Sequence, residues 1–162
     1  MSIVKTSAGL LMYRRAADGA VELLLAHPGG PFWANKDEGA WSIPKGEPDP
    51  GETDLLATAR REFEEETGVR PEGPFIALRP VTQKNRKVVH AWAFAGDCDP
   101  AAIRCNECEI EWPPRSGRRI SFPEIDRVEF FGIETARRKI NPAQAALLDE
   151  LLAALEGEGG EA

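Results

Sequence analysis

The chain is poor in cysteine, and it lacks both a long apolar run and an excess of positive charge. Its 162 residues include only three cysteines, Cys98, Cys105 and Cys108. The odd number argues against a disulfide framework, and one Cys-x-x-Cys pair supplies too few ligands for a structural zinc site. We therefore expect free thiols and a reducing, cytoplasmic location.

No apolar stretch approaches the roughly 18 residues that suggest a transmembrane helix, so no membrane partner is expected. Residues Met1–Tyr13 contain Lys5 but no continuous apolar core, which argues against a secretory signal. The formal net charge of −7 argues against a general nucleic-acid partner. A small anionic substrate stays compatible with this charge, because local cations or bound metal ions can invert the potential of one cleft.

The remaining composition is that of one ordinary globular domain. Hydrophobic residues make up 42% of the chain and charged residues 29%. The sequence contains no repeat and no second-domain boundary. We expect a single domain over residues 1–156 and a disordered tail over residues 157–162. A monomer and a homodimer are both compatible with the sequence.

Apolar runs separated by turn residues predict two β-hairpins and further strands. Strands are expected, in chain order, at residues 3–13, 21–27, 41–43, 75–83, 87–95 and 127–132. The Gly-, Pro- and Trp-rich segment 28–51 is long for a loop in a compact domain, and we interpret it as functional. Residues 97–117 show no regular pattern.

Two helices are predicted. The first is expected from about Thr53 to Thr67, with Thr53 or Asp54 as its cap and Gly68 as its stop signal. The second begins at Asn141-Pro142 and runs to about Leu155. Strands on both sides of a well-marked helix, with another helix at the end, predict a mixed α/β sandwich.

The first helix carries an acidic stripe beside its core face. At about 100° per residue, Glu62, Glu65 and Glu66 fall within about 100° of one another, whereas Glu64 points nearly the opposite way. Crowded carboxylates repel one another, and a hard cation such as Mg²⁺ relieves that repulsion. The alternative interpretation is an ordinary solvated helix face.

This segment resembles the second half of the Nudix box, the loop–helix–loop signature of the Nudix hydrolase family. Arg61-Glu62-Phe63, Glu65-Glu66 and Gly68-Val69 match it position by position, and Gly46, five residues and Glu52 match its first half. Eight residues, 53–60, separate the halves where the family pattern has seven. We expect the loop before the helix to absorb the extra residue, and the role of Glu52 stays open.

The resemblance extends beyond the box to a bacterial subgroup described as predicted nucleoside-triphosphate pyrophosphohydrolases. The segments that carry it are residues 27–33, 42–47, 112–117, 122–127 and 139–144. It implies a Nudix-type α/β/α sandwich with a mixed β-sheet.

The implied activity is Mg²⁺-dependent hydrolysis, with Mn²⁺ as a substitute, of a diphosphate linkage in a nucleotide or nucleoside-diphosphate-X substrate by metal-activated water. Glu62, Glu65 and Glu66 match the metal-ligand positions. Arg61 is expected to orient Glu65, and Glu124, before a predicted strand, matches the place of a further catalytic glutamate. The alternatives are a non-catalytic Nudix module that senses a nucleotide and an interaction domain with a solvated acidic helix.

Candidate substrate-binding residues follow from position and chemistry. Lys45 adjoins the box glycine, Gly46, and Arg115 belongs to a basic group near residue 118. Cations of this kind are needed close to bound phosphates. Trp33 is a candidate for stacking on a base. We expect Trp41 to be a core residue.

Overall fold

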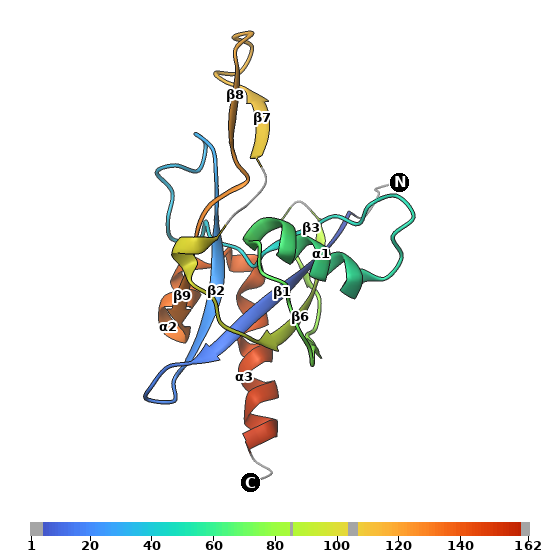
Figure 1. Cartoon of the computed structure of the whole chain (residues 1–162), viewed down its shortest axis with the longest axis vertical. Helices are drawn as coiled ribbons and strands as arrows, with labels where there is room; N and C mark the ends of the chain where they lie inside the picture. Colours follow the sequence, from blue (N-terminus) through green and yellow to red (C-terminus); the bar gives the residue numbers. More distant parts are fainter. Residues whose placement is uncertain (1–4, 85, 104–106, 160–162) are drawn as a thin grey trace.

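The computed structural model describes residues 5–84, 86–103 and 107–159, and its centre is a mixed seven-stranded sheet (Figure 1). The strand order is β4-β6-β1-β2-β9, with β3 paired to β1 and β5 paired to β6. The strands are β1 (Thr6–Arg15), β2 (Val21–Pro28), β3 (Lys45–Gly46), β4 (Ile76–Ala77), β5 (Val81–Thr82), β6 (Val88–Ala95) and β9 (Ile125–Gly132). β1 and β6 run parallel, and the other strand pairs of this sheet are antiparallel.

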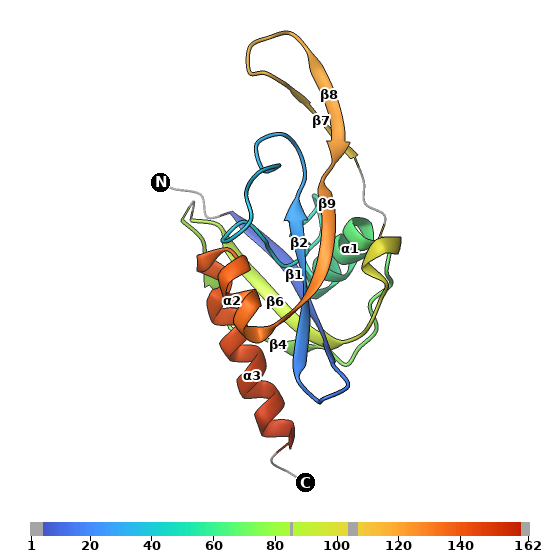
Figure 2. The ribbon, with the colours of Figure 1, turned by 90° about the vertical axis from the view of Figure 1, so that its left-hand side faces the viewer.

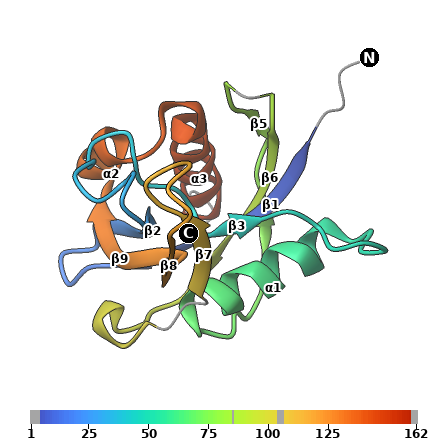
Figure 3. The same ribbon diagram turned by 90° about the horizontal axis from the view of Figure 1, so that it is seen from above.

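Helices cover both faces of this sheet, as the view from above shows (Figure 3). The helices are α1 (Leu55–Thr67), α2 (Ile133–Lys139) and α3 (Ala145–Gly159), with short 3₁₀ turns η1 (Pro100–Ala102) and η2 (Pro142–Gln144). α1 lies on one face of the sheet, and α2 and α3 lie on the other. The predicted α/β/α sandwich with a mixed sheet is confirmed.

Alternation along the strands creates one core on each face. Successive side chains of a strand point to opposite sides. Leu11 and Leu25 therefore join the core that includes Leu148 of α3, whereas Leu10 and Leu24 join the core that includes α1. Each fully buried leucine contributes about 1.5–3 kcal/mol relative to exposure. No helix among the described residues is long and apolar enough to cross a membrane.

Both ends of α1 are fixed by local hydrogen bonds. The Asp54 side chain caps the start by accepting from the backbone N–H groups of Leu56 (3.0 Å) and Ala57 (3.3 Å). Gly68 ends the helix in the left-handed region at φ 76°. Gly51, at φ 84°, turns the chain before the helix. The extra residue is thus absorbed upstream, as predicted, and the helix keeps its register.

The predicted second hairpin forms, but its first strand is interrupted. β4 and β5 both pair with β6, and Pro80 lies between them. Proline has no N–H to donate to a ladder, which explains the break. The strand expected at Trp41–Ile43 is reduced to isolated bridges, Trp41 to Ile140 and Ser42 to Ala26.

Three further elements differ from the sequence-based expectation. Part of the segment 97–117 forms β7 (Glu107–Glu111), which pairs with β8 (Arg119–Pro123) in a separate hairpin projecting from the body (Figure 2). α2 was not predicted, because only seven residues separate β9 from Ile140. α3 continues to Gly159, so part of the expected tail is helical, and residues 160–162 lie outside the described chain.

Candidate active site

The box glutamates of α1 lie beneath the short strand β3, where Gly46 permits an unusually close approach. A Cβ at Gly46 would fall 2.1–2.4 Å from the carboxylate atoms of Glu62, closer than real Cβ contacts. Next to it, the Lys45 backbone N–H donates to Glu66 Oε2 at 3.1 Å. Glycine at 46 therefore allows the β3 backbone to lie directly on the acidic stripe.

Glu66 is the most buried of these acids, with only 8% of its surface exposed. Burial raises its pKa to about 9, and the negative charges of Glu62 and Glu124 add to the rise. Lys45 opposes the rise through its charge and its backbone N–H. The positive charge around Glu66 is thus too small to stabilise its ionised form at neutral pH.

Glu62 shares this environment to a smaller extent. Its side chain is 15% exposed, and burial raises its pKa, opposed by hydrogen bonding to Arg61. Glu65 and Glu124 contribute further repulsion. Burial also lowers the pKa of Lys45, with the nearby charge of Lys87 adding to the effect. Exposure therefore increases along the predicted stripe, from buried Glu66 through Glu62 to Glu65, whose side chain is 43% exposed.

Arg61 organises the outer part of the stripe. Its guanidinium donates to both carboxylate oxygens of Glu52 (3.1 and 2.9 Å), to Glu62 (2.9 Å), to Glu65 (3.1 Å) and to the Glu47 carbonyl (3.2 Å). These contacts hold the pKa of Glu52 at about 2, with the Arg61 hydrogen bonds as the largest cause. Glu52 thus contacts Arg61 from the loop before α1 and holds its guanidinium against the helix.

We expect Arg61→Ala to destabilise the fold by about 1–3 kcal/mol, because it removes several charge-assisted hydrogen bonds from a side chain that is 25% exposed. At about 2–4 °C per kcal/mol for a chain of this size, thermal unfolding would detect the loss. Arg61→Lys should recover only part of it, since an ammonium lacks the planar fork.

Arg60→Ala is the matched control. Arg60 is exposed, and its guanidinium lies 5.4 Å from the centre of the Phe75 ring, a contact worth less than about 1 kcal/mol. An Arg61→Ala variant that loses no more stability than Arg60→Ala would contradict the anchoring role.

Glu124 lies in the bend between β8 and β9, and its backbone is held in place by the loop after β2. The Gly29 N–H donates to the Glu124 carbonyl at 2.9 Å, and a Cβ at Gly29 would fall 1.9 Å from the Pro123 carbonyl oxygen. Glu124 and Glu66 line one pocket of about 240 Å³ together with Lys45 and Ser42. The structure thus brings the predicted extra glutamate to the box.

Glu107, Glu109, Glu111 and Glu129 are the nearby acids that could replace Glu124 as the catalytic glutamate, and the side chain of Glu107 lies outside the described part of the chain. Glu109 pairs with Arg119 on the projecting hairpin, and Glu111 is exposed at the end of β7. Glu129 is exposed on β9, opposite Leu25. These three do not line the pocket that contains Glu66.

No three His, Cys, Asp or Glu side chains of the described residues are grouped closely enough to form a ready metal site. Arg61 donates hydrogen bonds to Glu62 and Glu65, and Glu66 accepts one from the Lys45 backbone N–H. The carboxylate oxygens nevertheless fit a hard divalent cation, because Mg²⁺ binds one or two carboxylates and retains several waters. Glu66 and Glu124 line the same pocket, and the charges of Glu62 and Glu124 raise the pKa of Glu66, which indicates a place for positive charge.

The other predicted substrate-binding residues lie apart from this pocket. Trp33 is half-buried in the turn after β2, packs edge-to-face on Phe32 at 5.0 Å and lies 5.2 Å from Lys36 Nζ. Arg115 is exposed, with φ 62°, in the turn of the projecting β7–β8 hairpin. Lys45 and Gly46 are therefore the substrate candidates that the fold places beside the box glutamates.

Sequence reasoning missed the anchor of the loop that carries Trp33. Buried His27 lies with Nδ1 2.9 Å from Asp126 Oδ1 and Nε2 2.6 Å from the Lys36 carbonyl oxygen. The sequence does show a histidine at the end of an apolar strand. It does not show the hydrogen-bond partners of that histidine, because they lie in other segments of the chain. Trp41 lies in the core with 1% exposure, as expected. Cys98 is a free thiol, whereas Cys105 and the side chain of Cys108 lie outside the described part of the chain.

Known proteins resemble this chain in their sequence profile and in their fold. The family profile described as NUDIX domain matches residues 5–151. A search of curated proteins finds no match. An Ap4A hydrolase from C. elegans, solved as a binary complex, is 24% identical with a TM-score of 0.65, over 93% of this chain and 98% of that chain.

Two other solved structures share the fold at lower identity. The NUDIX domain of Shewanella oneidensis NrtR, complexed with ADP ribose, is 13% identical with a TM-score of 0.65, over 96% of this chain and 90% of that chain. The MutT protein from Methanosarcina mazei is 18% identical with a TM-score of 0.54, over 90% of each chain. At these identities the likeness concerns the fold.

Proposed function

Because this chain belongs to the Nudix family of pyrophosphohydrolases, we propose that it hydrolyses a diphosphate linkage in a nucleotide or nucleoside-diphosphate-X substrate, with Mg²⁺ as its metal and Mn²⁺ as a substitute. The observation that carries the proposal is the buried carboxyl of Glu66, held by the Lys45 N–H and repelled by Glu62 and Glu124. We place the activity in the cytoplasm, in keeping with the free thiol of Cys98.

Glu62, Glu65 and Glu66 would hold the metal. When bound, the metal would lower the pKa of a coordinated water and neutralise charge on the diphosphate oxygens. Arg61 holds Glu62 and Glu65 at defined positions, and a metal held by Glu65 would compete with its hydrogen bond to Arg61. Glu52 would keep Arg61 near the helix in that case, since it accepts two hydrogen bonds from the guanidinium.

Other residues beside the acidic stripe would bind and orient the substrate. Lys45 lines the pocket that contains Glu66, and Gly46 follows it in β3. The Lys45 ammonium would compensate part of the charge of a phosphate group. Glu124 would accept a proton from the attacking water, directly or through one further water. Trp33 and Arg115 lie outside this pocket, so they would contact only a substrate that extends beyond it.

The test is the release of nucleoside monophosphate from a panel of nucleoside triphosphates, dinucleoside polyphosphates and nucleotide sugars, with and without Mg²⁺. We expect metal-dependent turnover of at least one class, abolished by EDTA and restored by Mg²⁺ or Mn²⁺. Tight nucleotide binding without any turnover would instead support a nucleotide-sensing module. An absence of both binding and turnover would leave only an interaction domain.

A further inference from the structure

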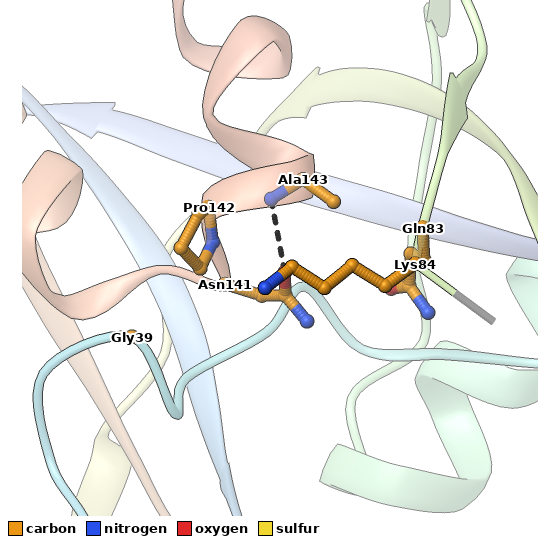
Figure 4. A pocket seen from close by; sticks show the side chains of 6 residues that line it. All are labelled: Gly39, Gln83, Lys84, Asn141, Pro142 and Ala143. Atoms are coloured by element: carbon orange, nitrogen blue, oxygen red, sulfur yellow. Dashed lines mark hydrogen bonds between the residues drawn. The ribbon is translucent and has the colours of Figure 1, made fainter.

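A second pocket opens on the α3 side of the segment that leads into β3. It encloses about 360 Å³, within the range of small-molecule sites, and is lined by Gly39, Gln83, Lys84, Asn141, Pro142 and Ala143 (Figure 4). Its walls come from three places in the chain: the loop before Trp41, the turn between β5 and β6, and the η2 turn. No acidic side chain is among the six lining residues.

The orientation of the Gln83 amide follows from a buried hydrogen-bond relay. The Ile43 backbone N–H donates to Gln144 Oε1 at 3.1 Å, so that atom must be the oxygen. Gln144 Nε2 then donates to Ser42 Oγ and to Gln83 Oε1, each at 3.0 Å. Because the Gln83 oxygen faces this relay, its Nε2 group, a donor, is left for the pocket.

The Asn141 amide is oriented in the same way. The Ala143 backbone N–H donates to Asn141 Oδ1 at 3.0 Å, the dashed bond of Figure 4. The oxygen is thereby fixed by a backbone donor, and Nδ2 can donate, since it has no acceptor within the described part of the chain. Figure 4 also shows the Lys84 side chain extending across the pocket toward Asn141. Lys84 has no ion-pair partner among the residues that the structure describes.

Among the described residues, the side-chain groups of this pocket that have no hydrogen-bond partner are therefore all donors: the Lys84 ammonium and the amide N–H groups of Gln83 and Asn141. A ligand that satisfies them must supply several acceptor atoms and negative charge. We propose that this pocket is a subsite for a phosphoryl group.

The subsite adjoins the proposed active site. Gly39 lines the pocket with Lys84, whereas Ser42 lines the pocket with Glu66. The Ser42 hydroxyl also accepts a hydrogen bond from Gln144. Three residues of extended chain span at most about 11 Å. A phosphoryl group of the substrate, remote from the cleaved linkage, would thus fit here; this assignment to the substrate rests on the proposed function. Free phosphate is the other source of the same chemistry.

Direct binding tests the chemistry without requiring turnover. Inorganic phosphate is titrated into the full chain by calorimetry in EDTA, so that no metal draws the anion to the acidic stripe. Gln83→Glu and Asn141→Asp keep the oxygen that serves the internal hydrogen bonds and replace the free amide donor with a negative oxygen. Each should weaken phosphate binding about tenfold or more, as should Lys84→Ala, while thermal unfolding stays near wild type.

Lys5→Ala is the matched control, since Lys5 is an exposed lysine at the same end of the sheet, next to Val88. It should leave phosphate binding unchanged, and higher salt should weaken binding to the wild type. A wild type that binds no phosphate, or isosteric variants that bind it as tightly as the wild type, would overturn the subsite.

Kinetics then separates the two sources. If the phosphoryl group belongs to the substrate, Asn141→Asp should raise KM for a nucleoside triphosphate about tenfold with little change in kcat, and should affect a nucleotide sugar less. If only free phosphate binds, KM should not change although phosphate affinity falls. Absence of turnover in the wild type would refute the proposed hydrolase function, while the calorimetric result would still decide the subsite.

Discussion

A Glu66→Gln variant is expected to lose about 100-fold or more of the wild-type turnover and to keep its fold. Glutamine retains an oxygen that can accept from the Lys45 N–H, so the contact between β3 and α1 survives. It cannot ionise, and therefore it offers a metal only a neutral oxygen. Residues that merely orient metal ligands already contribute about 10–100-fold, and a ligand should contribute more.

The stability of the same variant reports on the buried carboxyl. In metal-free protein, the pKa of Glu66 is raised from 4.5 to about 9, so between these values the folded state binds more protons than the unfolded state. The wild type should therefore lose stability as pH rises from about 5 to 9, by up to about 1.4 kcal/mol per pH unit. Glu66→Gln lacks this slope and should be increasingly more stable than the wild type over that window.

Thermal unfolding in EDTA from pH 5 to pH 9 measures the difference, and added Mg²⁺ should stabilise the wild type more than the variant. Glu64→Gln is the matched control. Glu64 is exposed on the same helix and faces away from the stripe, so both its turnover and its pH profile should equal those of the wild type. Parallel profiles for Glu66→Gln and wild type would refute a buried ionisable group at this site.

The elements that the sequence predicts well are those whose signals are local. α1 is defined by a cap at Asp54, a left-handed glycine at 68 and apolar residues at helical spacing, and the structure contains all three features. The stripe of Glu62, Glu65 and Glu66 follows from helical periodicity alone. Even the extra residue of the box could be placed, because an insertion inside the helix would rotate that stripe.

The features that the sequence did not predict depend on contacts between distant segments. The anchoring of Arg61 by Glu52 requires the loop before α1 to fold back onto the helix. The relay from Ile43 to Gln144 joins residues 101 positions apart. β7 alternates charged and apolar residues, but its partner strand lies beyond a turn that contains two prolines. Local propensity cannot identify such pairings, since each depends on the whole fold.

Glu124→Gln is expected to lower kcat by about 10²- to 10⁴-fold, the usual contribution of a general base. Glu124 lines the pocket that contains Glu66 and Lys45, and its charge contributes to the raised pKa values of Glu62 and Glu66. Glutamine preserves the side-chain shape, and the backbone bond from Gly29 does not involve the side chain. The position of the amide should therefore match that of the lost carboxylate.

The kinetic pattern distinguishes a base from a metal ligand. Loss of kcat with unchanged Mg²⁺ affinity would identify a base, because proton transfer would be impaired while the metal stays bound. Weakened Mg²⁺ affinity, with activity recovering at high Mg²⁺, would identify a ligand. Glu109→Gln is the matched control, since Glu109 pairs with Arg119 on the projecting hairpin and should not affect turnover. If Glu124→Gln retains wild-type kcat while Glu109→Gln loses it, the catalytic glutamate lies on the hairpin instead. That result would require the hairpin to fold down onto the pocket during turnover, and cross-linking it in the extended position should then abolish activity.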